Sequence, residues 1–319
     1  MTAFVKPGWS APSTILFACS IPVNQKALSF ARADAVKFGA KLILFHAYDT
    51  LGGATSKPAS TPLYDYSAAA RSEMLQLEPL SQQVRDAGVD CEVVVRPGLV
   101  ADQIVAFLRE REIDRVVMGA HSPGPIGRIL GGSLAEAVLR AIRVPTCVIG
   151  PSVVDGASRN FAIHTVLCAV SLLKTSHLVV EFAAELAAQH NARLVLQHVI
   201  KPQERQQVLA GRSIDQIEAD MLALVPEELA SRITMQAIVV PGDPTEELLY
   251  QAGAQLADLI VLGAQGASAF AAITRHGVVY KVLAHAHCPV ITLSPAVLAA
   301  CGVPGDRHQT SEANMAGVF

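Results

Sequence analysis

Short apolar runs alternate along this chain with longer segments in which apolar residues recur at helical spacing, and the whole pattern occurs twice. The short runs are apolar at successive positions, as in strands of a parallel sheet whose two faces are both buried. Strands and helices in regular alternation predict a layered α/β fold. The predicted strands are Ile15–Ala18, Leu42–His46, Glu92–Val95, Val116–Met118, Thr146–Ile149, Val166–Ala169, Leu194–His198, Ala237–Val240, Leu259–Leu262 and Val290–Leu293.

The predicted helices carry their own start and stop signals. Between the first two strands, residues 27–38 place apolar side chains at helical spacing, and Gly39 ends the helix as a C-cap would. In the second half, Asp243 is suited to cap a helix, Pro244 to occupy its first position, and Glu246 to complete a capping box. The corresponding segment of the first half has no comparable cap.

The two halves also repeat one another segment by segment. TILFACS at residues 14–20 resembles TVLCAVS at 165–171, and DRVVMGAHS at 114–122 resembles DLIVLGAQG at 258–266. Because the matching segments keep their order, the chain is one domain duplicated. Each copy is expected to be a doubly wound, Rossmann-like domain with a five-stranded parallel sheet of order 3-2-1-4-5. The expected organisation is a first domain at 1–150, a linker at 151–162, a second domain at 163–294 and a mobile tail at 295–319.

Composition narrows the function classes. Of the 319 residues, 51% are hydrophobic and only 17% are charged, which is ample material for two buried cores. A formal net charge of -3 and an aromatic content of 5% provide no basic field or stacking surface for nucleic acid. No apolar run reaches the roughly 20 residues of a membrane helix, and the N-terminus lacks the apolar core of a signal peptide. We therefore expect a cytoplasmic protein without nucleic-acid or membrane partners.

Histidine and cysteine residues are further candidates for chemistry. The segment HAHCP places His285, His287 and Cys288 close together, but a helix end suits histidine, and we expect no metal there. His46 and His198 end equivalent strands, where they are either paired catalytic bases or, as we favour, structural side chains that satisfy backbone groups. No cysteine belongs to a CxxC pair, and we expect the thiols to act as small hydrophobic groups. The cysteines are Cys19, Cys91, Cys147, Cys168, Cys288 and Cys301.

A ligand of such a sheet is expected where the strand order reverses, outside the carboxyl ends of the strands. That point lies after Ala18 and Met118 in the first half and after Ala169 and Leu262 in the second. Glycine and serine in the loop after Met118 could present backbone N–H groups to a phosphate at a helix N-terminus. Glycine is equally the usual residue of a tight turn, and spacing alone leaves both interpretations open.

The duplicated order, the segments GAHS, GAQG and PGDPTEEL, and a last strand anchored by proline make the chain resemble a tandem, UspA-like universal stress protein. The resemblance covers residues 13–150 and 163–294. Nucleotide-binding members of that family carry Gly-x2-Gly-x9-Gly-Ser/Thr after the fourth strand. The first half departs from this motif at its second glycine, and the second half at its closing Gly-Ser. The matching residues are Gly119, Ser122, Gly132 and Ser133 in the first half and Gly263, Gly266, His276 and Gly277 in the second.

Two further pairs of positions bear on a nucleotide. Relatives that bind one place an aspartate just after the first strand, where this chain has Ser20 and Ser171. A serine hydroxyl is a weaker hydrogen-bonding partner than a carboxylate. Ala47 and Val199 match the small apolar residue that those relatives place near adenine. The resemblance therefore implies that both pockets persist while their polar contacts are weakened.

The second glycine loop offers a different contact. Arg275 and His276 stand where the phosphates would lie in a nucleotide-binding relative. They are either a direct anion contact with pH-dependent affinity or a solvated basic pair at a helix start. We favour the solvated pair.

Three functions are compatible with the resemblance. The first, which we favour because both motifs are broken, is a non-enzymatic stress-response binding or regulatory protein with degenerate nucleotide loops. The second is a protein that holds ATP or another adenine nucleotide, with Mg, in at least one half. The third, a nucleotide phosphohydrolase, needs an activated water or metal ligands, and the sequence offers neither.

The resemblance also implies how the halves assemble. Single-domain members pair through the last strand, whose edge is otherwise exposed. A tandem chain can make the same pairing between its own halves, as an intramolecular pseudo-dimer. A homodimer of two whole chains is a further alternative, and the sequence names no protein partner.

Overall fold

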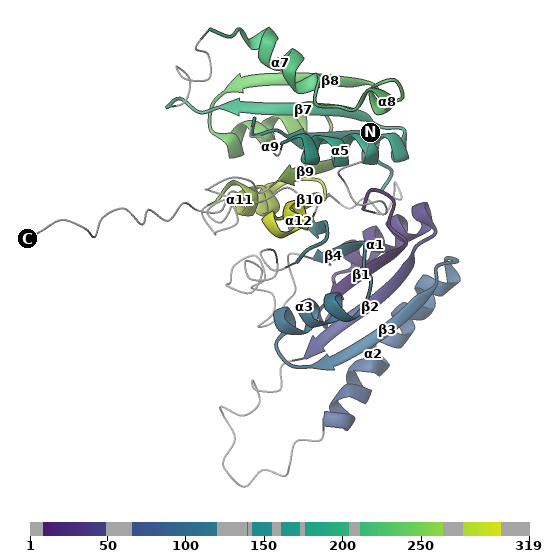
Figure 1. The fold of residues 1–319 in the computed structure, drawn as a ribbon. Helices are drawn as coiled ribbons and strands as arrows, with labels where there is room; N and C mark the ends of the chain where they lie inside the picture. The colour runs from purple at the N-terminus through teal and green to yellow at the C-terminus, as the bar shows by residue number, and fades with distance from the viewer. Residues whose placement is uncertain are drawn as a thin grey trace, which may run out of the picture.

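A computed structural model gives the fold, in which strands and helices alternate through both halves (Figure 1). It describes residues 9–48, 66–119, 139, 142–154, 161–172, 176–203, 211–263 and 277–300. The first half contains β1 (Thr14–Cys19), α1 (Gln25–Phe38), β2 (Lys41–Tyr48), α2 (Tyr66–Asp86), β3 (Cys91–Pro97), α3 (Val100–Glu110), β4 (Arg115–Gly119) and β5 (Thr146–Ile149). The second half contains β6 (Thr165–Ala169), α5 (Ser176–His190), β7 (Arg193–Ile200), α7 (Ile214–Leu222), α8 (Glu227–Ala230), β8 (Met235–Pro241), α9 (Pro244–Ala254), β9 (Leu259–Gly263), α11 (Val278–His285), β10 (Val290–Leu293) and α12 (Pro295–Ala300).

All the strands form one ten-stranded sheet of order β3-β2-β1-β4-β5-β10-β9-β6-β7-β8. Each half contributes five parallel strands in the order 3-2-1-4-5, as predicted. Every predicted strand is present, and several extend a residue or two beyond the predicted ends. Strand order reverses between β1 and β4 and again between β6 and β9. In each half, the position expected for a ligand therefore lies beyond the carboxyl ends of these strands, and we call it the crevice of that half.

The halves join through β5 and β10, which pair antiparallel with Val148 opposite Val290. At the end of β5, Gly150 lies so close to α11 that a Cβ atom added there would be 2.3 Å from the carbonyl oxygen of Leu283. Beyond it, the backbone N–H of Val154 donates to the carbonyl of His287 at 3.0 Å. The intramolecular pseudo-dimer is confirmed, and the first residues of the expected linker pack against the second half.

Equivalent hydrogen bonds confirm the duplication in atomic detail. The Asp114 carboxylate accepts a bond from the backbone N–H of Thr14 at 3.1 Å, at the start of β1. The Asp258 carboxylate accepts one from the backbone N–H of Thr165 at 3.0 Å, at the start of β6. Each aspartate ties the first strand of its half to the neighbouring fourth strand.

The first helices of the two halves end in the same way. Gly39 follows α1 with φ 63°, and its N–H donates to carbonyls of the last helical turn, as predicted. Asn191 follows α5 with φ 52°, in the same left-handed region. Glycine and asparagine are the two residues that most readily adopt this conformation at a helix end.

One predicted helix start is only partly confirmed. The Asp243 carboxylate caps α9 by accepting bonds from the backbone N–H groups of Thr245 and Glu246 at 2.8 and 3.1 Å. In a complete capping box the Glu246 side chain would also accept a bond from the backbone N–H of Asp243, and the described residues show no such bond. A complete capping box forms instead at α7, between Ser213 and Gln216.

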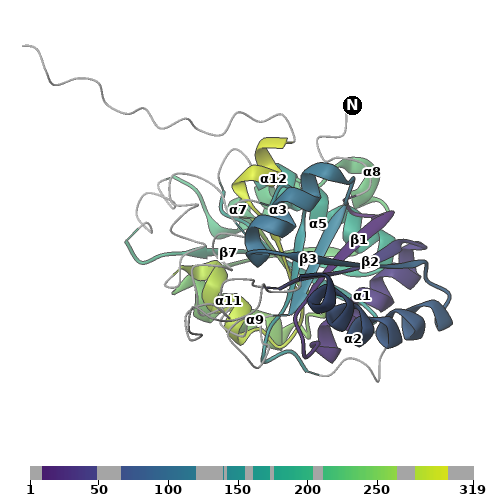
Figure 2. The same cartoon turned by 90° about the horizontal axis from the view of Figure 1, so that it is seen from below.

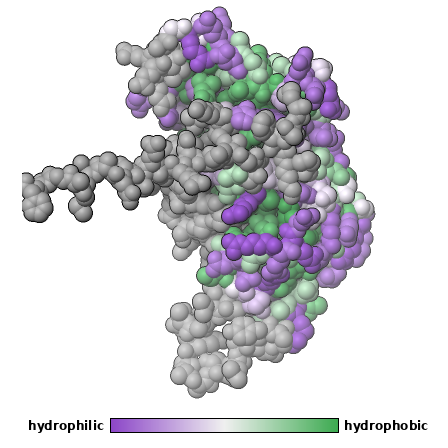
Figure 3. Space-filling view, viewed as in Figure 1, coloured by the Kyte–Doolittle hydropathy of each residue, from purple (hydrophilic) through white to green (hydrophobic). Residues whose placement is uncertain are grey.

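Two hydrophobic cores cover the two faces of the sheet, and each runs through both halves. Helices lie on both sides of the sheet (Figure 2). On the face visible in Figure 3, hydrophilic residues cover much of the coloured surface, with smaller hydrophobic patches between them. The five cysteines of the described residues are free and buried in this framework, as expected.

The prediction that a mobile tail begins at residue 295 places its start too early. Residues 295–300 form α12, in which Val297 and Leu298 are buried against the core. Burial of these two side chains explains why the helix stays on the sheet after β10 ends. No helix in the described part of the chain has the length and hydropathy to cross a membrane.

Candidate functional site

The crevice of the first half lies beyond the ends of β1 and β4, which run side by side with Ala18 opposite Met118. The backbone of Gly119 ends β4 directly beneath the side chain of Asn24. A Cβ atom on Gly119 would lie 2.7 Å from Nδ2 of Asn24 and 2.9 Å from its Cβ. Glycine here therefore allows a close approach between strand and helix, besides any contact it could make with a ligand.

Asn24 is the crevice residue that the sequence reasoning missed. Its side-chain oxygen accepts a hydrogen bond from the backbone N–H of Ala27 at 3.1 Å and so caps α1. The sequence could have indicated its capping role, because asparagine just before an amphipathic helix is a favoured N-cap. Its contact with Gly119 joins residues far apart in the sequence, and no local pattern reports it.

Ser20 lies at the end of β1 and is only 8% exposed. Its hydroxyl donates to the carbonyl of Pro22 at 3.2 Å. Ala47, the candidate residue near adenine, is 1% exposed and belongs to the core beneath α3. The structure thus brings Ser20, Asn24 and Gly119 to one crevice and leaves Ala47 in its buried wall.

The crevice of the second half lies beyond β6 and β9 and differs in its side chains. Ser171 and Ser176 share a hydrogen bond of 3.1 Å between their hydroxyl oxygens, and Ser176 is buried at the start of α5. Gly263 ends β9, and Gly277 is the N-cap of α11 without a side-chain cap. Val199 is half-buried on β7.

Gln197 is a second residue that the sequence reasoning missed. It lies on β7 opposite Ala169, the last residue of β6, and is 1% exposed. Its Nε2 donates to the backbone carbonyl of Glu247 at 3.0 Å. Its buried Oε1 has no hydrogen-bond partner in the described part of the chain.

The paired histidines have the structural role that we favoured. Nδ1 of His46 lies 2.9 Å from the carbonyl oxygen of Cys19, and Nδ1 of His198 lies 2.7 Å from that of Val170. A carbonyl oxygen only accepts, so each Nδ1 donates and each ring ties one strand to its neighbour. Glu73 of α2 lies 3.8 Å from Nε2 of His46.

The HAHCP segment brings its side chains to different partners. His285 ends α11, and Nδ1 of His287 lies 3.4 Å from the backbone carbonyl of Ser152. Burial raises the pKa of the Cys288 thiol to about 12, so it is a poor thiolate ligand at neutral pH. Within the described ranges, no three metal-ligating side chains gather at one point.

The remaining candidates of the glycine loops fall outside the described residues. They are Ser122, Gly132, Ser133, Gly266, Arg275 and His276.

The sequence profile of the universal stress protein family matches this chain twice, at residues 13–150 and 162–294. The chain belongs to the universal stress protein family. Both matches coincide with the halves of the sheet, so this member carries two family domains in one chain.

Individual proteins are similar to this chain in sequence or in fold. One from Methanocaldococcus jannaschii is 30% identical over 73 residues, a match that spans 23% of this chain and 43% of that relative. A crystal structure of a universal stress protein from Archaeoglobus fulgidus is similar over 88% of this chain and 96% of its own, with a TM-score of 0.66 and 20% identity. A protein of unknown function from Pseudomonas aeruginosa PAO1 is similar over 93% and 98%, with a TM-score of 0.62 and 16% identity. These two structures share the tandem fold.

Proposed function

We propose that this universal stress protein is a cytoplasmic, non-enzymatic binding or regulatory protein of the stress response, with degenerate nucleotide loops. The first-half crevice carries the proposal. The Ser20 hydroxyl that stands in place of an aspartate donates to the Pro22 carbonyl, and Asn24 lies against Gly119. Both side chains serve the local fold, which weakens the polar contacts left for a nucleoside.

The chemistry of the described residues supports a binding protein over an enzyme. Burial raises the pKa of the Cys19 and Cys168 thiols to about 12, which keeps them protonated and weakly nucleophilic. His46 and His198 donate Nδ1 hydrogens to carbonyl oxygens, which fixes their orientation. A hydrolase of nucleotide phosphates would require a metal site or an activated water, and the described ranges offer no cluster of metal ligands.

Gln197 favours a second candidate function, adenine nucleotide binding in the second half alone. Its buried Oε1 is an acceptor to which no described residue donates, within β7 and opposite Ala169 at the end of β6. The exocyclic amino group of adenine is a donor of matching chemistry. In the first half the equivalent residue, one before the paired histidine, is Phe45, which packs in the core. The two halves would then differ in their ability to hold a base.

The deciding experiment uses protein purified without added nucleotide. The protein is denatured, and released nucleotides are quantified by chromatography with mass detection, alongside calorimetric titration with Mg-ATP. We expect neither stoichiometric nucleotide nor measurable heat at near-millimolar ATP. Tight binding that is lost in Gly266→Val or Gln197→Leu would replace the first proposal with the second.

Two controls keep these outcomes separate. Phe45→Leu makes a comparable change at the equivalent first-half position, and it should leave any second-half binding intact. Phosphate release from Mg-ATP is measured in parallel, and turnover above the buffer rate would establish the hydrolase. Thermal unfolding of each variant shows that a loss of binding is not a loss of fold.

A further inference from the structure

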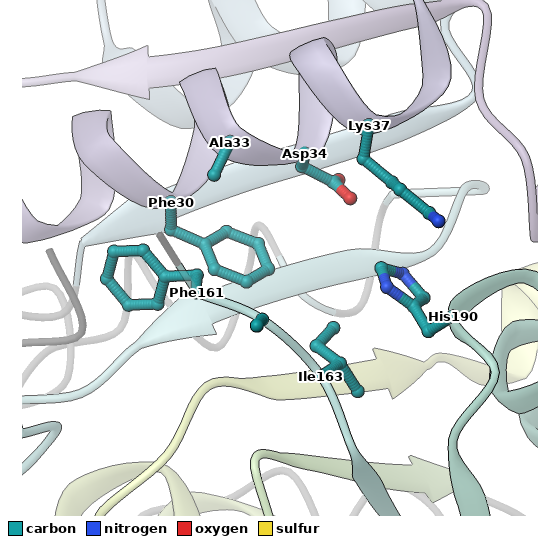
Figure 4. A pocket seen from close by; sticks show the side chains of 8 residues that line it. Phe30, Ala33, Asp34, Lys37, Phe161, Ile163 and His190 are labelled. Atoms are coloured by element: carbon teal, nitrogen blue, oxygen red, sulfur yellow. The ribbon is translucent and has the colours of Figure 1, made fainter. Parts of the chain in front are cut away.

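A cavity of about 90 Å³ lies between the two halves, on the side of the sheet covered by α1. Phe30, Asp34 and Lys37 of α1 line one wall, and residues 161–163 with His190 of α5 line the other (Figure 4). It is remote from both crevices, because those lie beyond the carboxyl ends of the strands and the C-terminal turns of α1 lie near the opposite edge of the sheet. Each half of the chain contributes one wall.

The cavity has an apolar end built from two aromatic rings. Phe30 and Phe161 meet edge to face, with ring centroids 5.4 Å apart and planes at 85°. Ile163 extends this apolar wall on the second-half side (Figure 4). This end would receive a small hydrocarbon group.

The other end is polar. Asp34 is already paired, because Nη1 of the buried Arg115 donates to its Oδ2 at 2.7 Å. Nε2 of His190 is buried without a hydrogen-bond partner in the described structure. In Figure 4 the His190 ring points toward Asp34 and Lys37.

The charges around this end leave a positive excess. Arg115 and Asp34 cancel one another, whereas Lys37 has no carboxylate partner among the described residues. Residues 161–163 contribute no charged side chain. Burial, with smaller contributions from the charges of Lys37 and Arg115, lowers the pKa of His190 to about 4. The imidazole thus senses a positive field in the cavity.

A wider groove, open to solvent, adjoins the cavity. It has a volume of about 570 Å³ and shares Ala33, Lys37 and Phe161 with the cavity. Arg32 adds a second cation to its wall, and Val36 adds an exposed apolar side chain. The cations of this groove would therefore attract a small anion toward the cavity.

We propose that this cavity binds a small monocarboxylate of the size of acetate. The carboxylate would accept hydrogen bonds from the Lys37 ammonium and from Nε2–H of His190, and the methyl group would face Phe30 and Phe161. The volume sets the size, because an engineered cavity that binds benzene has about 150 Å³ and this cavity is smaller. The site is independent of nucleotide binding in either crevice.

The same arrangement predicts how binding depends on pH. A bound carboxylate would offset the positive field and raise the pKa of His190 from its lowered value. By linkage, acetate would bind more tightly as the pH falls from neutral toward 5, where a growing fraction of His190 takes up a proton when the anion is present.

The test is an NMR titration of the full chain with sodium acetate at constant ionic strength, following the ring resonances of the histidines. We expect a saturable shift of the His190 signals and a rise in its pKa. Lys37→Met should weaken acetate binding by about tenfold or more, as expected for loss of a charge-assisted hydrogen bond. Lys37 is exposed, so this variant should fold normally.

Arg109→Met is the matched control, since it removes one exposed positive charge on α3, away from the cavity. It should bind acetate as the wild-type protein does. The proposal is overturned if His190 shows no saturable shift with acetate in the tens of millimolar. It is equally overturned if Lys37→Met and Arg109→Met behave alike, or if inorganic phosphate produces the same shift, because that ion would indicate general anion screening.

Discussion

The two halves of the chain fill the space between the first helix and the fourth strand in opposite ways. In the first half, Arg115 of β4 and Asp34 of α1 form an ion pair with 1% and 3% of their side chains exposed. In the second half, Leu259 follows Asp258 as Arg115 follows Asp114, and Leu186 takes the place of Asp34 on α5. Both leucines are fully buried.

This difference shows that the same sheet topology can be stabilised by a buried ion pair or by buried leucines. Strand order, register and the left-handed end of the first helix are the same in both halves, so a buried ion pair is not a requirement of the fold. Arg115 has a further task in the first half, since its guanidinium donates to the carbonyls of Trp9 and Ser10 at 2.8 and 3.2 Å. The ion pair thus anchors the segment that precedes β1.

The largest expected effect comes from breaking this pair on one side. Arg115→Leu leaves the Asp34 carboxylate buried without its partner, and we expect the free energy of unfolding to fall by about 3–5 kcal/mol. Chemical denaturation measures it. The double variant Arg115→Leu with Asp34→Leu copies the second half and should recover most of the loss. A double variant no more stable than the single one would contradict the comparison.

The next effect concerns the junction of the two halves at β5 and β10, where the residues that follow the two strands differ. Gly150 follows β5 against the Leu283 carbonyl, whereas Ser294 follows β10 and donates its hydroxyl to the Ile142 carbonyl at 2.8 Å. Gly150→Ala places a methyl group against that backbone oxygen and should lower the free energy of unfolding by about 1–3 kcal/mol.

The matched control for Gly150→Ala is Gly253→Ala on α9. A Cβ atom there has no neighbour within 4 Å, and alanine is the better helix former by about 1 kcal/mol. Thermal unfolding should therefore show opposite shifts for the two variants. Equal shifts would mean that Gly150 is not confined by the second half.

A third difference concerns Phe38 and His190, which end α1 and α5 at equivalent positions. The folded-state pKa of His190 is lowered to about 4, below its unfolded value, so the unfolded chain binds the proton first. Stability from the neutral ring is present above about pH 6.5 and is lost as the pH falls toward 4. The slope is at most about 1.4 kcal/mol per pH unit.

His190→Gln should remove this slope. The measurement is the difference in unfolding free energy between wild type and variant at neutral pH and at about pH 4.5, so that carboxylates common to both cancel. A difference that does not change with pH would show that the His190 pKa is not lowered in the folded protein.

The smallest effects compare the two helix ends. Gly39→Ala forces a Cβ atom into the left-handed region at φ 63° and should cost about 1 kcal/mol. Asn191→Gly keeps that conformation and should change stability by only a few tenths of a kcal/mol. Paired denaturant curves resolve the contrast, and equal losses would contradict the shared cap geometry.

The fold was largely predictable because its signals are local. Buried parallel strands appear in the sequence as continuous apolar runs. Because the domain is duplicated, each strand is predicted twice, once from each copy. α12 was missed because a six-residue segment is too short to show helical periodicity, and its position depends on burial of Val297 and Leu298 against residues distant in the sequence.

The candidate site was harder to predict because its contacts are distant in the sequence. The motif residues marked the correct ends of β1, β4, β6 and β9, as sheet topology requires. The approach of Asn24 to Gly119, the burial of Gln197 beneath the Glu247 carbonyl and the pairing of Arg115 with Asp34 depend on which segments the fold brings together. Hydrophobic periodicity carries no information on such pairs.

The contact between Phe38 and His190 has a consequence for symmetry. The two residues occupy equivalent positions and touch each other, with ring centroids 5.5 Å apart and planes at 87°. In a dimer of identical subunits, a residue on the two-fold axis meets its own copy, and every substitution appears twice. Fusion of the two copies into one polypeptide removes that constraint. An aromatic ring can then face an imidazole at the axis, and each copy can evolve without altering the other.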